Sequence, residues 1–147
     1  MPSDAEHLAV AERNQQLIDH LLPDISRFGD WITVIAFYRA LHLVEAVFFC
    51  NHPNKHGHNH ESRENMLKRT PRYKHIYKHY RTLWAASTVA RYLEDRSSGT
   101  TYASFADYLS LADVQGLILN HYTSLHKGCF LCHPRLNHAR NGAQKLH

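Results

Sequence analysis

Apolar residues recur at helical spacing in every long segment of this chain, and no segment shows the sustained alternation typical of a strand. A first helix is expected to begin at Ser3, because Ser3 and Glu6 have the spacing of a capping box. Pro23 should end this helix, since proline lacks a backbone N–H and clashes with the preceding turn. The expected buried stripe consists of Leu8, Ala11, Ile18, Leu21 and Leu22.

A second helix is predicted from about Asp30, a good N-cap, to about Cys50. It is apolar on almost every side, which is typical of a helix at the centre of a bundle or at an oligomer interface. Buried polar groups cost free energy unless they are partnered, so the polar residues of this helix mark a candidate site. They are Tyr38, Arg39, His42 and Glu45.

Two further helices follow a turn-rich loop. Asn59 is the expected cap of a short helix over 60–68, and Thr70-Pro71 has the cap-then-proline order that begins a helix, here reaching about Leu93. The segment 96–100 is expected to be a flexible connection.

The last long helix should open at Ser104 with Asp107, continue to about His126 and stop at Gly128. These elements predict an all-α fold: an antiparallel up-down bundle of four long helices plus one short helix, in residues 1–128. A basic tail containing cysteine and histidine, residues 129–147, completes the chain.

Composition bounds the class of protein. The 147 residues suffice for one domain with a core, and the net charge of +4 permits an anionic partner without requiring one. Three cysteines do not form a disulfide framework, and no secretory signal is visible. The apolar run within 31–50 contains charged residues and is a poor membrane span. We therefore expect a cytoplasmic protein without a membrane partner.

The polar residues of the second helix are spaced so that their side chains can reach one another. Glu45 near His42 would favour the charged imidazole, and histidine is the usual proton shuttle near neutral pH. The pattern therefore fits an active site. The alternative is a satisfied core network that fixes helix register, and it is the favoured interpretation, because structural ion networks perturb titratable groups as readily as active sites do.

Two patterns suggest metal binding. His56, His58 and His60 alternate in the loop, but no His-Glu-x-x-His helix accompanies them, and no cofactor is expected there. The motif Cys-x-x-Cys-His matches that of c-type haem attachment. Haem attachment normally follows export, and the absence of a visible export signal argues against it. These tail residues could instead bind zinc. The competing interpretation is that the two cysteines are reduced and bind no metal. The weak candidate ligands are Cys129, Cys132, His133 and His138.

Basic and aromatic residues interleave from Lys68 to Arg91. Tyrosines can stack on unpaired bases while Lys and Arg hold phosphates. A core-facing helix with a solvated flank gives the same pattern.

With these segments in view, the chain resembles the HEPN superfamily (higher eukaryotes and prokaryotes nucleotide-binding domains). The resemblance covers about Glu6 to His126. It is carried by FYRALHLVEAVFF at 37–49, by the loop ending in His58-Asn59-His60-Glu61-Ser62-Arg63, and by WAASTVARYL at 84–93. It implies an antiparallel helical bundle that forms a homodimer. Members include metal-independent endoribonucleases, toxins of toxin–antitoxin pairs, and inactive modules that bind nucleotides or partner proteins.

Active ribonucleases of that family carry an arginine, four to six intervening residues and a histidine. Here only two residues separate Arg39 from His42, and the same holds for Arg135 and His138. Six residues separate Arg13 from His20, but this pair lies on the first helix, whereas the family motif usually sits late in the bundle. The resemblance therefore favours a binding module for RNA, a nucleotide or a partner protein, with a nucleotidyltransferase as one candidate partner.

Three functions stay open at this point. In the binding module, the ligand-binding residues would include Tyr38, Glu45, His58 and Arg91. In a metal-independent ribonuclease, His42 or His60 would be the acid–base group, and Arg39 or Arg63 would stabilise the charge on phosphate. The third alternative is a metal-binding protein that uses the histidine loop or the cysteine tail.

Overall fold

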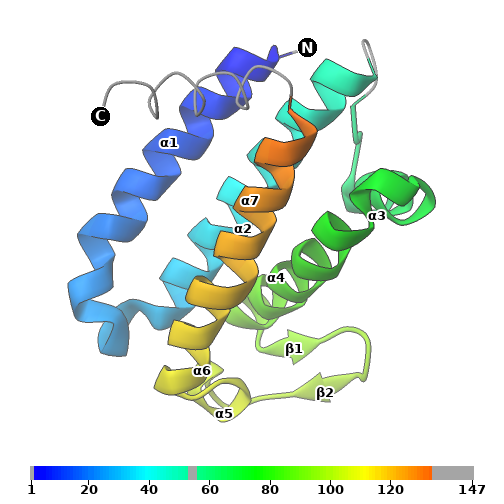
Figure 1. Ribbon diagram of the computed structural model, residues 1–147. Helices are drawn as coiled ribbons and strands as arrows, with labels where there is room; N and C mark the ends of the chain where they lie inside the picture. The colour runs from blue at the N-terminus through cyan, green and yellow to red at the C-terminus, as the bar shows by residue number, and fades with distance from the viewer. Residues whose placement is uncertain (1, 53–55, 134–147) are drawn as a thin grey trace.

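The computed structural model describes residues 2–52 and 56–133, and these residues are almost entirely helical, which confirms the all-α class. Helix α1 (Asp4–Leu21) and helix α2 (Ile25–Asn51) are joined by a 3-10 turn, η1 (Leu22–Asp24). Figure 1 shows α1 running away from the N-terminus and α2 returning beside it.

The capping box at Ser3 is confirmed: its hydroxyl accepts from the Glu6 backbone N–H, and the Glu6 carboxylate accepts from the Ser3 N–H. The predicted start of the second helix at Asp30 is wrong. Helix α2 begins earlier, at Ile25, and kinks at Phe28, where φ is −117° and ψ is 20°. Pro23 starts a turn that passes directly into the next helix, so Asp30 lies inside α2 and accepts a hydrogen bond from the Trp31 N–H.

Helix α3 (His60–Arg69) has the predicted Asn59 cap. A 3-10 turn, η2 (Pro71–Tyr73), then precedes helix α4 (Lys74–Tyr92). The connection after α4 is a small hairpin of β1 (Glu94–Asp95) and β2 (Thr100–Thr101).

The predicted last helix is divided. Helix α5 (Phe105–Tyr108) ends at the extended residue Leu109, because Ser110 and Asp113 form a second capping box that begins helix α6 (Leu111–Gly116). A π-helical turn, η3 (Leu117–Tyr122), continues into helix α7 (Thr123–Cys132).

Gly128 does not stop the helix, as the sequence had predicted; it lies inside α7. A Cβ on Gly128 would lie 2.7 Å from the His75 ring and 3.1 Å from Ile76 Cγ1, so glycine here permits close approach to α4. The predicted boundary at 128 therefore falls within a helix, and Cys129 is a core residue with no exposed surface. Residues 134–147 of the predicted tail lie outside the described residues.

Helix α2 is the central element, packed against α1, α4 and α7 (Figure 1). The core gathers apolar residues of α2, α4 and α7, including Phe37, Phe48, Tyr80 and Leu125. By length and composition the stretch within 4–51 could cross a membrane, yet 78% of its most apolar window is buried in the fold. That burial is what the core helix of a globular protein shows.

Alanine at Gly116, the last residue of α6, and at Gly128, inside α7, should act in opposite directions. Gly128→Ala should lower the free energy of unfolding by about 1 kcal/mol, because its new methyl group is crowded by Ile76. Gly116→Ala meets no atom closer than 3.9 Å and should raise stability by about 0.5–1 kcal/mol through helix propensity. Urea denaturation measures both. Equal shifts in one direction would contradict the close packing of α7 on α4.

Candidate functional site

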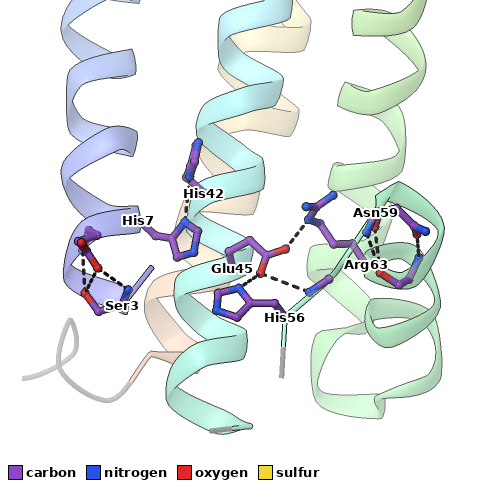
Figure 2. Close-up of polar contacts among 10 residues, drawn as sticks. Ser3, His7, His42, Glu45, His56, Asn59 and Arg63 are labelled. Carbon is purple, nitrogen blue, oxygen red and sulfur yellow. Dashed lines mark hydrogen bonds and ion pairs between the residues drawn. The ribbon is translucent and has the colours of Figure 1, made fainter. Parts of the chain in front are cut away.

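Five polar side chains meet where the first turn of α1, the C-terminal half of α2, the following loop and α3 come together. Figure 2 shows them side by side, with the Glu45 carboxylate between the histidines and Arg63. We call this group the Glu45 cluster; it consists of His7, His42, Glu45, His56 and Arg63.

Glu45 is 2% exposed, so its carboxylate depends on nearby donors. Arg63 Nε–H donates to Oε1, while His56 Nδ1 lies 2.8 Å and the Gly57 backbone N–H 3.4 Å from Oε2. Because a carboxylate only accepts, His56 carries its proton on Nδ1 in this contact. The other ring nitrogen, Nε2, then has a free lone pair whenever the ring is neutral.

Gly57 is required beside this carboxylate. A Cβ built at Gly57 would lie 2.0 Å from Arg63 Cγ and 2.9 Å from Glu45 Oε1. Only glycine leaves room for the loop backbone to approach both side chains.

His7 and His42 form a second contact within the Glu45 cluster, with their Nδ1 atoms 2.9 Å apart. One ring must donate and the other accept. Burial lowers the pKa of both histidines, so the neutral imidazole is favoured at pH 7. The rings of His7 and His56 lie 5.4 Å apart, and both Nε2 atoms are buried without a hydrogen-bond partner among the described residues.

The chemistry of this cluster suits a cation better than an anion. The charge of Arg63 is compensated by Glu45, and the neutral imidazoles of His7 and His42 add no positive charge. By contrast, His7, Glu45 and His56 each place a ligand atom within 4.8 Å of the other two. Two imidazoles and one carboxylate form a common ligand set for zinc and for non-haem iron.

Other predicted site residues lie elsewhere. Arg39 does not contact His42: it is buried, and its guanidinium carbon lies 4.8 Å from the centre of the Tyr122 ring. His60 stacks on Trp84 with ring centres 5.6 Å apart, and His58 is exposed.

Arg91 and Tyr38 form a separate contact on the exposed side of α2 and α4. Arg91 Nη1 donates to the Tyr38 hydroxyl at 3.4 Å. The predicted catalytic and binding residues therefore divide among several places. His42, Glu45 and Arg63 lie in the Glu45 cluster, together with His56 of the histidine loop.

The predicted tail ligands also separate. Burial strongly raises the pKa of the Cys129 thiol, and Cys132 donates to the Arg72 carbonyl at 3.7 Å. Two groups of three metal-ligating side chains occur among the described residues, and neither contains these cysteines. His133 lies instead beside Asp4 and Cys50, while His138 lies outside the described residues.

Sequence reasoning missed His7 and Asp4 as site residues. A usable signal exists: residues 4, 7, 11 and 18 are buried at helical spacing, so both side chains lie on the stripe that also carries Ala11 and Ile18. A histidine and an aspartate at core-facing positions require partners.

Acidification should destabilise the protein in part through His60. Burial, and then the neighbouring cations Arg63, Arg91 and Arg96, lower the pKa of His60 below its ordinary value of 6.5. The unfolded chain therefore binds more protons, and the stability due to neutral His60 is present above pH 6.5 and lost as pH falls towards the lowered pKa. Urea midpoints at pH 7.5 and 5.5, measured with EDTA, should differ less in His60→Phe, which keeps a ring against Trp84.

The matched control for this prediction is His58→Gln, at the exposed position two residues earlier. It should retain the pH dependence of the wild type. If His60→Phe also retains it, His60 does not contribute to acid sensitivity.

Comparison with protein-family models, curated proteins and solved structures gave no match. The HEPN resemblance thus stays a prediction from sequence. Among the described residues, the Glu45 cluster brings together the largest group of buried and half-buried titratable side chains.

Proposed function

We propose that this protein binds a divalent transition metal, with zinc as the best fit, through His7, Glu45 and His56. One observation carries the proposal. The Nε2 atoms of His7 and His56 are buried and lack a hydrogen-bond partner among the described residues, beside a buried carboxylate.

Unsatisfied buried polar atoms are costly, at about 1–3 kcal/mol each. A metal ion would satisfy such nitrogens, since neutral imidazole is the commonest metal ligand. For Glu45 to bind the same ion, the His56 ring would have to release its Nδ1 contact with Oε2 and turn, because Nε2 points away from that oxygen in the present contact. Imidazole ligation favours zinc, copper, nickel or iron over calcium and magnesium. Three protein ligands would leave a further position for water or a substrate group.

Hydrogen bonds around the Glu45 cluster hold two of the proposed ligand side chains in place. Arg63 holds one oxygen of Glu45, and His42 holds Nδ1 of His7. Such outer contacts fix the orientation of the ligands.

The three ligands come from three segments: α1, α2 and the loop that precedes α3. A bound ion would therefore cross-link the loop to the two packed helices. Because the unfolded chain offers no preformed site, binding would stabilise the folded protein. The proposed role is that of a metal-responsive helical protein.

Within the all-α class, we propose that the fold is a HEPN-like four-helix bundle. The three segments that carry the resemblance contact one another pairwise. Glu45 binds Arg63, His60 stacks on Trp84, and Tyr38 accepts from Arg91. Dimerisation, a nucleotidyltransferase partner and a cytoplasmic location remain predictions.

Loss of the two imidazoles should remove one equivalent of bound zinc. Dialysis equilibrium with untagged protein, in the presence of a competing chelator, measures this stoichiometry. The double variant His7→Ala/His56→Ala should bind one equivalent less than the wild type, while the exposed pair His20→Ala/His58→Ala should bind as the wild type does. Helical circular dichroism in EDTA checks that each variant is folded. Equal zinc binding by both double variants, in folded protein, would refute the proposed site.

A second candidate function is the binding of single-stranded RNA on the exposed face of α4. Lys74, Lys78 and Arg81 line a groove of about 650 Å³ together with Tyr77 and Tyr108. Their spacing puts the three cations on one face of the helix, and none is ion-paired among the described residues. Cations beside aromatic rings suit phosphates and unpaired bases.

Removing the three groove cations should weaken RNA binding at least tenfold. Lys74→Ala/Lys78→Ala/Arg81→Ala should also flatten the salt dependence by about 2 in logarithmic slope, at about 0.7 per phosphate contact on a single strand. Fluorescence anisotropy with labelled single-stranded RNA, over a range of salt, measures both quantities.

The control removes equal charge at exposed positions elsewhere: Arg13→Ala/Arg27→Ala/Arg96→Ala. A loss of the same size in this variant would show that net charge alone attracts RNA. Absence of RNA binding by the wild type would exclude the function.

A further inference from the structure

A second group of metal-ligating side chains lies at the same end of the α1–α2 pair and shares no residue with the Glu45 cluster. We call it the Cys50 cluster: Asp4 in the first turn of α1, Cys50 in the last turn of α2, and His133 directly after α7. His133 has no exposed surface and Asp4 is 3% exposed, while Cys50 is half-buried.

The three side chains form a compact triangle. Cys50 Sγ lies 3.0 Å from His133 Nε2 and 3.3 Å from Asp4 Oδ2, and His133 Nε2 lies 3.3 Å from the same carboxylate oxygen. Three different donor atoms, sulfur, nitrogen and oxygen, therefore approach one point.

This geometry differs from that of a nucleophilic cysteine relay. In such a relay the carboxylate holds the imidazole nitrogen that faces away from the nucleophile. Here the thiol and the carboxylate both approach Nε2 of His133. The arrangement does not place Asp4 behind the imidazole, so it cannot orient His133 as a base for Cys50 in the manner of a relay.

The same geometry fits a zinc ion closely. Bonds of about 2.0–2.3 Å to oxygen, nitrogen and sulfur imply ligand–ligand separations of about 3.3–3.8 Å at the corners of a tetrahedron. The observed separations of 3.0–3.3 Å are only slightly shorter. Small outward shifts of the side chains would admit the ion.

We propose that Asp4, Cys50 and His133 form a second transition-metal site, distinct from the Glu45 cluster and marked by a thiolate ligand. Zinc suits a mixed set of sulfur, nitrogen and oxygen donors. Cys50 lies at the C-terminal end of α2, where the partial negative charge of the helix favours a cation. Water would supply the fourth ligand.

The site would join three points that are far apart in sequence. It ties the start of α1 to the end of α2 and to the end of α7. An ion bound only by the folded chain would stabilise the packing of these three ends. In this role the Cys50 cluster is a clip between the three helices.

Cobalt(II) titration tests the proposal, because a thiolate ligand gives a charge-transfer absorption in the near ultraviolet that imidazole and carboxylate ligands do not. Wild-type protein should show this band, and Cys50→Ser should lose it. Cys132→Ser is the matched control at another half-buried cysteine and should retain the band. Asp4→Asn should raise, at least tenfold, the cobalt dissociation constant measured from the growth of this band.

The test separates this site from the Glu45 cluster. His7→Ala/His56→Ala should keep the thiolate band, so failure of the first site leaves the second intact. Retained cobalt binding without the band in Cys50→Ser would show that this variant still folds and binds metal at the Glu45 cluster. A wild type without the band, or a band lost in Cys132→Ser but kept in Cys50→Ser, would overturn the proposal.

Discussion

The buried carboxylate of Glu45 is the constraint on which this end of the molecule depends. An uncompensated charge at 2% exposure would be expensive, and the chain compensates it with donors from two later segments, Arg63 of α3 and the loop residues His56 and Gly57. Satisfying one carboxylate therefore fixes where the loop and α3 lie. It also holds the His56 ring 5.4 Å from the His7 ring, centre to centre, which brings the proposed ligands together.

Both proposed metal sites follow from polar residues placed on core-facing stripes. The first turn of α1 supplies Asp4 and His7, and the C-terminal half of α2 supplies Glu45 and Cys50. The antiparallel packing of these two helices brings the four residues to one end of the fold (Figure 1). The basic groove on α4 involves other residues, so metal and RNA binding are separable properties of the chain.

Local signals in the sequence predicted local structure well. The capping box at Ser3, the Asn59 cap and the all-α class are confirmed, because caps act over a few residues. Gly128 was wrongly predicted to end the helix, because glycine is needed there for close packing against α4 and not for a helix stop. The break at Leu109 was missed because Ser110 caps a new helix. Spacing could group Arg39 with His42 but could not show that Arg39 turns to Tyr122 while His42 meets His7. Partners that are distant in sequence are set by packing.

The central claim is that His7, Glu45 and His56 hold one metal ion. Zinc-edge X-ray absorption on Cys50→Ser protein loaded with one equivalent of zinc tests it most directly, since the thiolate site is then removed. The bound zinc should have only nitrogen and oxygen ligands at about 2.0–2.1 Å, two of them imidazoles. A spectrum without two imidazole ligands, or one that does not change when His7 and His56 are replaced, would contradict it.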